Sequence, residues 1–211
     1  MDLRDDSFVT AAHIALTLVT RPEVAARWDT PSTLPEMTVG MLACHLGRQT
    51  VRAHELLPFV ATEAPLASAI DHYRRAAWVT TSDLKDPAND RSNDSEDAAL
   101  GFEALRTRCA AAFDDVRDDL MSGAAADVVA IPWQGWSLRR PDFLLTRTVE
   151  IVVHADDLAR SVDVPTPEFP DDVYLPVVHL LVQLAAERHG QAATTSALAR
   201  RERMPETISA F

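Results

Sequence analysis

The chain has 211 residues, of which 47% are hydrophobic, and it can therefore bury one sizeable core. Its 32 acidic residues outnumber its 20 basic residues and give a net charge of −12, which disfavours a surface built to attract nucleic acid or an anionic membrane. No apolar run reaches the roughly 18 to 20 residues of a membrane span, and the acidic start at residues 1–6 is unlike a signal peptide. We therefore expect a cytoplasmic protein, a monomer or a homodimer, without a nucleic-acid or membrane partner.

Apolar residues recur at helical spacing through most of the first half of the chain. Those at positions 8, 12, 15 and 19 lie three or four apart and predict a first helix, which Pro22 should break or kink near its end. Thr38 is the expected N-cap of a second helix, and Pro58 should end that helix. After a third helix, a polar stretch without periodicity predicts a mobile loop. The predicted helices cover residues 8–28, 38–57 and 66–80, and the predicted loop covers residues 81–94.

The second half of the chain begins with a fourth predicted helix. The segment after it is too short and irregular for a helix and is expected to lie extended along the other helices. Helical spacing then resumes near residues 137–141, with Pro141 tolerated only in the first turn of a helix. A stiff linker with two prolines separates this helix from a last long helix and an arginine-rich helical tail. These elements cover residues 95–122 (helix), 126–136 (extended), 137–161 (helix), 164–167 (linker), 171–188 (helix) and 192–211 (tail).

These elements predict an all-α fold. Four principal helices with one or two long connections form a four-helix bundle, an architecture that builds metal sites from inward side chains. We expect residues 1–162 to form the bundle and residues 163–211 to form a C-terminal helix and tail packed on it. The two cysteines, Cys44 and Cys109, are too few for a disulfide framework and are expected to be core residues.

A polar stripe runs along the otherwise apolar helix predicted at residues 137–161. Glu150 and His154 are four residues apart and therefore share one face, and Arg147 and Asp157 extend that face by three residues at either end. Burying such groups is costly unless each is paired or bound to a cation. The stripe is therefore either the water-facing side of an amphipathic helix or part of a buried site.

His45 has a comparable setting on the second predicted helix. Leu42 and Leu46 flank it on the apolar side of that helix. A lone histidine in a core is usually only hydrogen-bonded. Together with Glu150 and His154 from a facing helix, His45 instead matches a three-ligand metal site.

Two segments about 100 residues apart carry a resemblance to a known family. Residues 28–46 read WDTPSTLPEMTVGMLACHL, and residues 147–158 read RTVEIVVHADDL. Together they resemble the mycothiol-dependent maleylpyruvate isomerase family within the DinB-like superfamily. The resemblance implies a four-helix bundle in which His45, Glu150 and His154 bind one divalent metal ion, usually zinc.

The resemblance covers roughly residues 8–162 and stops short of the C-terminus. The isomerases end in a small α/β domain, whereas residues 163–211 of this chain predict a helix and a tail. Met37 also stands where the first motif commonly carries tryptophan. The resemblance therefore implies a thiol cofactor more directly than it implies one particular substrate.

A site with three protein ligands leaves at least one coordination position open, which is typical of catalytic rather than structural zinc. The same ligand set also suits nickel, iron or manganese. A low-molecular-weight thiol such as mycothiol, docked at the ion, would be a thiolate nucleophile at neutral pH. The sequence therefore predicts a divalent-metal-dependent enzyme that uses a mycothiol-like thiol for S-transfer to, or thiol-assisted isomerisation of, a small electrophilic substrate.

Three further residues are candidates for positioning the ligands or contacting the substrate. Arg147 is placed to orient the ligand carboxylate or to meet an acidic substrate. Alternatively, it forms an ordinary salt bridge with Asp157 or lies on the helix surface. Asp157 is expected to accept a hydrogen bond from an imidazole, unless it is a solvated charge near the helix end. Trp133 is either a wall of the pocket mouth or a core residue. The other histidines have no comparable setting, and His54 lies half a turn out of phase with His45.

Two other functional classes stay open at this point. A non-catalytic bundle would use its metal for stability, sensing or partner binding, and a purely structural site would be closed by a fourth Cys or His ligand, which is not evident here. A hydrolase that uses a metal-bound water would need a general base near the open position, and the sequence does not identify one.

Overall fold

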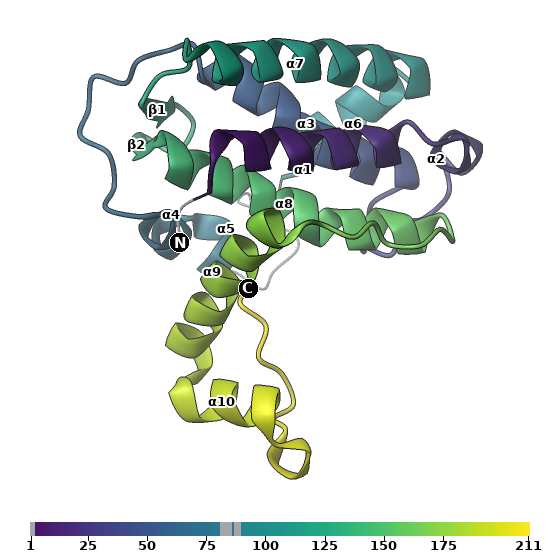
Figure 1. Ribbon diagram of the computed structural model, residues 1–211. Coiled ribbons are helices and arrows are strands. Elements are labelled where there is room, and N and C mark those ends of the chain that lie inside the picture. The colour runs from purple at the N-terminus through teal and green to yellow at the C-terminus, as the bar shows by residue number, and fades with distance from the viewer. Residues whose placement is uncertain (1–2, 81–85, 87–89) are drawn as a thin grey trace.

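Four long helices form the centre of the structure, a computed structural model that describes residues 3–80, 86 and 90–211 (Figure 1). They are α1 (Asp5–Val19), α3 (Val39–Leu56), α7 (Phe102–Ser122) and α8 (Arg140–Ser161). Each of α1 and α3 packs against both α7 and α8, so α7 and α8 lie on opposite sides of the bundle. The predicted all-α four-helix bundle is confirmed.

The core of the bundle is filled by apolar side chains from all four helices. Phe8 of α1, Leu42 of α3, Val116 of α7 and Phe143 of α8 are all buried. Burial of each such side chain contributes roughly 1.5 to 3 kcal/mol to folding. The polar groups of α3 and α8 that face the bundle interior are therefore embedded in a largely apolar environment.

Helix α3 approaches α7 closely at Gly47. A Cβ atom at this position would lie 2.5 Å from the Sγ atom of Cys109, so only glycine allows this approach without a shift of its neighbours. Cys44 and Cys109 are both buried, as predicted for core residues. Burial raises the pKa of Cys44 to about 12 and that of Cys109 to about 11, so neither thiol is a ready nucleophile.

Local sequence explains where α3 and α8, the helices that carry His45, Glu150 and His154, begin. The side chain of Thr38 accepts a hydrogen bond from the backbone N–H of Met41 at 3.2 Å, and it caps α3 as predicted. Pro141 lies in the first turn of α8, where its missing N–H group leaves no hydrogen bond unmade.

Three of the predicted helices are interrupted in the structure. The first ends at Val19, and a new helix begins at Pro22. The third is broken at Ala76, which has extended backbone, and the fourth is broken at Gly101, whose φ angle of 86° lies in the left-handed region. The short helices that result are α2 (Pro22–Ala26), α4 (Ala69–Arg75), α5 (Ala77–Thr80) and α6 (Ser92–Ala99). Most of the predicted loop at residues 81–94 lies outside the described residues, and its end belongs to α6.

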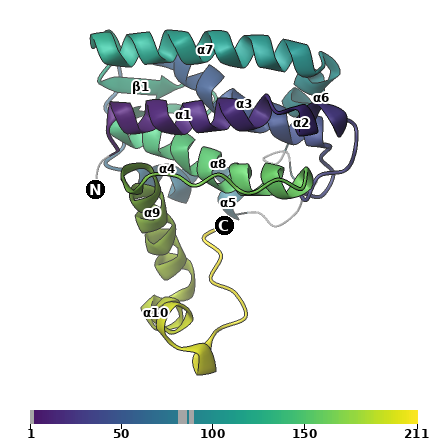
Figure 2. The same ribbon diagram turned by 45° about the vertical axis from the view of Figure 1, so that its right-hand side comes forward.

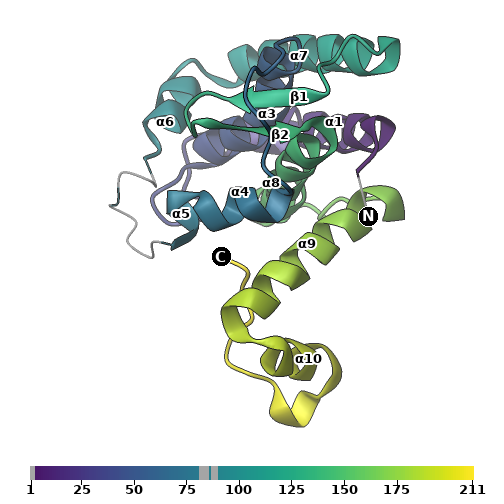
Figure 3. The same cartoon turned by 90° about the vertical axis from the view of Figure 1, so that its left-hand side faces the viewer.

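A two-stranded antiparallel hairpin precedes α8 (Figure 3). It consists of β1 (Val128–Ile131) and β2 (Trp136–Arg139), with Ile131 opposite Trp136. The predicted extended segment is therefore present. Pairing with β1 extends it to Arg139, and the helix then begins at Arg140, within the range 137–141 in which it was expected to resume. The turn between the strands carries Trp133.

The C-terminal segment projects away from the α8 side of the bundle (Figures 1 and 2). Helix α9 (Asp171–His189) packs against α8 and α1, and α10 (Gln191–Ala199) packs against α9. The prediction of a helical tail fails after the 3₁₀ turn at Arg201–Arg203, because the chain then runs back without helix toward α4 and α5. The ring of Phe211 lies 5.0 Å from that of Trp78. Among the described helices, none combines the length and apolar character needed to cross a membrane.

Candidate metal centre

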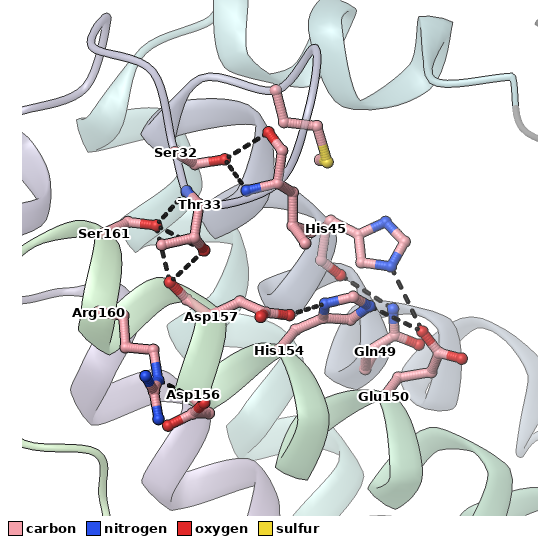
Figure 4. A network of polar contacts seen from close by, with 12 residues as sticks. Ser32, Thr33, His45, Gln49, Glu150, His154, Asp156, Asp157, Arg160 and Ser161 are labelled. Atoms are coloured by element: carbon pink, nitrogen blue, oxygen red, sulfur yellow. Dashed lines mark hydrogen bonds and ion pairs between the residues drawn. The ribbon is translucent and has the colours of Figure 1, made fainter. Parts of the chain in front are cut away.

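Helices α3 and α8 bring His45, Glu150 and His154 together inside the bundle (Figure 4). The Nε2 atoms of His45 and His154 each lie 3.4 Å from Glu150 Oε2. One candidate ligand atom from each residue lies within 4.8 Å of the other two. The imidazole rings of His45 and His154 are nearly perpendicular, at 84°, with ring centroids 4.7 Å apart. The two nitrogens and the carboxylate oxygen therefore face a common point.

The spacing of these atoms fits a divalent ion. Ligand atoms about 2.0 to 2.1 Å from a tetrahedral zinc ion lie about 3.3 Å from one another, by simple trigonometry on ordinary zinc bond lengths. The separation of 3.4 Å between each Nε2 atom and the Glu150 oxygen agrees with that value. It is long for a hydrogen bond, so the arrangement suits a shared cation better than direct pairing.

The outer nitrogen of each imidazole faces a carboxylate. Asp157 Oδ2 lies 3.0 Å from the Nδ1 atom of His154, and Asp94 Oδ2 lies 3.2 Å from the Nδ1 atom of His45. A carboxylate can only accept a hydrogen bond, so both Nδ1 atoms carry the proton in the neutral ring. The Nε2 lone pairs are then free for a metal ion, which is the arrangement that usually supports a histidine ligand.

The Asp157 end of this network is fixed by the loop before α3 (Figure 4). The hydroxyl group of Ser161 donates a hydrogen bond to the backbone oxygen of Asp157 at 2.7 Å. The Thr33 hydroxyl group donates to the same oxygen at 3.1 Å, and its backbone N–H donates to Ser161 at 2.9 Å. The first motif therefore contributes to this site through its loop as well as through its histidine.

Asp94 was missed by the sequence analysis, which placed it in a loop. It is only 4% exposed and forms an ion pair with Arg48 at 2.6 Å. Arg48 also pairs with Asp97, and the hydrogen bond from Arg108 is the largest cause that lowers the pKa of Asp97 to about 2. The sequence offers only an indirect sign of this ion pair. Arg48 lies one turn after His45, and Asp94 and Asp97 are spaced to share one face of a helix that is distant in the sequence.

The charges of His45, Glu150 and His154, here called the triad, interact strongly. Burial raises the pKa of Glu150, but the contacts with His154 and His45 outweigh burial and hold this pKa well below its usual value. Burial lowers the pKa of His154, yet Asp157 and Glu150 together raise it to about 9. For His45, the contacts with Asp94 and Glu150 similarly outweigh burial and raise the pKa. Positive charge is therefore strongly favoured at the point where the three side chains meet.

A cavity of about 400 Å³ opens beside the triad. Trp133 and Arg147 both line it, as the sequence analysis allowed. Trp133 is 52% exposed and is therefore not a core residue, and the Arg52 guanidinium lies 4.0 Å above the centre of its ring. Arg147 donates a hydrogen bond to Gln49 Oε1 at 2.8 Å, and among the described residues it forms no salt bridge with Asp157.

His72 also lines this cavity, although the sequence analysis assigned it no functional setting. It is 3% exposed, and the indole N–H of Trp136 donates a hydrogen bond to its Nδ1 atom at 3.2 Å. Burial is the main cause that lowers the pKa of His72 to about 4. The ring is therefore neutral at pH 7, with its proton on Nε2. His54 instead lies on the side of α3 that faces α7, 3.7 Å from Asp115.

Comparison with known proteins gives one match. The family model for the mycothiol maleylpyruvate isomerase N-terminal domain matches residues 9–159, well over half of the chain. The matched range begins in α1 and ends in α8, so it contains all three residues of the triad. Neither the search of curated proteins nor the search of solved structures found a match.

Proposed function

Because the chain belongs to the mycothiol maleylpyruvate isomerase N-terminal domain family, we propose that it is a divalent-metal-dependent enzyme that works with a low-molecular-weight thiol. The thiol is mycothiol or a close relative, and its sulfur is added to a small electrophilic substrate. The outcome is S-transfer, or isomerisation if the thiol leaves again. The observation that carries this proposal is the convergence of His45, Glu150 and His154 at the wall of a cavity large enough for small molecules.

We propose His45, Glu150 and His154 as the metal ligands and zinc as the ion. Two imidazole nitrogens and one carboxylate oxygen form a common catalytic zinc ligand set, which also accepts iron, nickel or manganese. Such an ion, when bound, lowers the pKa of a thiol docked on it, so that thiolate is available at neutral pH.

The surrounding residues have separate roles in this proposal. Asp94 and Asp157 hold the two imidazoles with Nε2 facing inward. Trp133 and His72 line the cavity and shape the space for the substrate. The cavity favours a catalytic site over a purely structural one, because among the described residues no further histidine or cysteine joins the cluster of three.

The test is a thermal-shift titration of the purified, metal-loaded protein with mycothiol and, separately, with glutathione. Saturating mycothiol should raise the melting temperature by about 5 to 10 °C, since a ligand at 100 times its Kd stabilises by roughly 2.7 kcal/mol. Glutathione should have a much smaller effect. The His54→Ala variant is the matched control, because it lies on the same helix outside the triad and should respond as the wild type does.

Two results would count against the proposal. A protein that holds its metal but responds to neither thiol would point to a non-catalytic metal-binding bundle or a hydrolase. An equal response to mycothiol in the metal-free protein would show that the thiol binds elsewhere.

A further inference from the structure

Four arginines line the cavity beside the triad, and they differ in how their charges are balanced. Arg48 forms ion pairs with Asp94 and Asp97. Within the part of the chain that the structure describes, Arg52 and Arg147 form no ion pair with any carboxylate. Arg91 forms no ion pair there either, but it donates a hydrogen bond to the Sδ atom of Met37. Arg52 and Arg147 are therefore two of the three cavity arginines that have no carboxylate within ion-pair distance among the described residues.

Both guanidinium groups are nevertheless held in place. Arg52 stacks on Trp133, with its Cζ atom 4.0 Å from the ring centroid. Arg147 donates hydrogen bonds to Gln49 Oε1 at 2.8 Å and to Thr146 Oγ1 at 3.3 Å. All of these partners are neutral. The two arginines are thus preorganised without being neutralised, which is how binding sites for anions are built.

The two charges are close enough to repel each other. Burial, followed by the charges of Arg147 and Arg48, lowers the pKa of Arg52 to about 10. Arg52 is still protonated at pH 7, so the repulsion is present in the ligand-free protein. An anion between Arg52 and Arg147 would relieve it.

We propose that Arg52 and Arg147 form a subsite for a carboxylate group of the small molecule that reacts at the triad. Arginine is suited to this role because its planar fork can donate two parallel hydrogen bonds to one carboxylate. Only the identity of the reacting molecule depends on the function proposed above, because binding of a carboxylate at this subsite can be measured without any thiol.

The proposed subsite lies near the triad along both helices. Arg147 lies one turn before Glu150 on α8, and Arg52 lies two turns after His45 on α3. At a rise of 1.5 Å per residue, these offsets correspond to about 5 and 10 Å along the helices. Both arginines therefore lie within two turns of a triad residue, on the helices that carry the triad.

The experiment is a calorimetric titration of the purified full-length protein with succinate and with succinamide, its neutral analogue. It is done with the protein as purified and again after removal of metal with a chelator. Wild-type protein should bind succinate and not succinamide in both states. Arg52→Met and Arg147→Met should each weaken succinate binding at least tenfold, and Arg147→Lys, which keeps the charge but loses the fork, should have an intermediate effect.

Arg106→Met is the matched control, because Arg106 is exposed on α7 and pairs with Glu103. It should bind succinate as the wild type does, and circular dichroism with melting curves should show that all variants are folded. The inference is overturned if the two methionine variants bind succinate as tightly as Arg106→Met does, or if wild-type protein binds no succinate in either state. Loss of the mycothiol response with intact succinate binding would instead refute the thiol-dependent function and leave the subsite standing.

Discussion

The carboxylate of Asp157 lies 3.0 Å from the Nδ1 atom of His154, one turn earlier on the same helix. This contact fixes the proton on Nδ1 and turns the Nε2 lone pair toward Glu150 and His45. Asp94 has the same relationship to His45, but it reaches that histidine from a different helix. Replacement of Asp157 and replacement of Asp94 are therefore expected to have different effects.

Replacement of Asp157 by asparagine removes the negative charge and keeps the shape. We expect metal affinity to fall by roughly 10- to 100-fold, the usual effect of losing a carboxylate partner of a histidine ligand. Competition with a chelating dye would measure this. The control is Asp156→Asn, because the adjacent Asp156 points to Arg160 and Thr166 and not to the triad. Equal losses in both variants would mean that the orientation of His154 does not depend on Asp157.

Asp94→Asn should destabilise the fold as well as the site. Asp94 is buried against Arg48, and its neutralisation leaves Arg48 with Asp97 as its remaining partner. We expect a loss of about 3 kcal/mol in the free energy of unfolding, at the lower end of the range for breaking a buried ion pair. Urea titration of metal-free protein would measure it. Asp114→Asn, at an exposed pair with Arg117, should change the same free energy by less than about 0.5 kcal/mol.

His72 should make the stability of the protein depend on pH. An unfolded histidine titrates near pH 6.5, whereas the pKa of His72 in the fold is about 4. Between these values the unfolded chain binds a proton that the native state does not, so this contribution is complete above pH 6.5 and is lost as the pH falls to about 4. The maximum loss is about 3 kcal/mol.

The His72→Gln variant tests this assignment by urea unfolding at several pH values. It should lose less stability than the wild type between pH 7 and pH 4, whereas His179→Gln, at an exposed position of α9, should follow the wild-type curve. Identical pH profiles for His72→Gln and wild type would show that His72 titrates normally in the folded protein.

Gly47→Ala tests the close approach of α3 and α7. The added methyl group would lie 2.5 Å from the Sγ atom of Cys109, so we expect a net loss of about 1 to 3 kcal/mol despite the better helix propensity of alanine. The Cys109→Ala change should recover part of this loss in the double variant, because it removes the clashing sulfur atom. A Gly47→Ala protein that melts at the wild-type temperature would contradict the close packing.

The features that sequence spacing alone predicts are those whose contacts are local. Glu150, His154 and Asp157 lie on one helix, and their spacing of three and four residues places them on one face. The N-cap at Thr38 was likewise a short-range signal. The four-helix bundle followed from the same periodicity, repeated along the chain.

The parts that could not be predicted depend on contacts between distant segments. Asp94 is 49 residues from His45, in a polar region without periodicity, and only the packing of α6 on α3 brings the two together. The state of His72 depends on Trp136, 64 residues later, at the end of the segment that was expected to be extended, and the sequence gives no sign that the two side chains meet. The break at Gly101 was missed because a single glycine does not by itself end a helix.

The most direct test of the central claim is the metal content of three purified proteins, measured by elemental analysis after exhaustive dialysis. We predict about one divalent metal ion per chain in the wild type and in His54→Ala, and a substoichiometric amount in His154→Ala, whose ring supplies one of the three converging ligand atoms. Full metal content in His154→Ala, or none in the wild type even after incubation with zinc, would contradict the assignment of His45, Glu150 and His154 as a metal site.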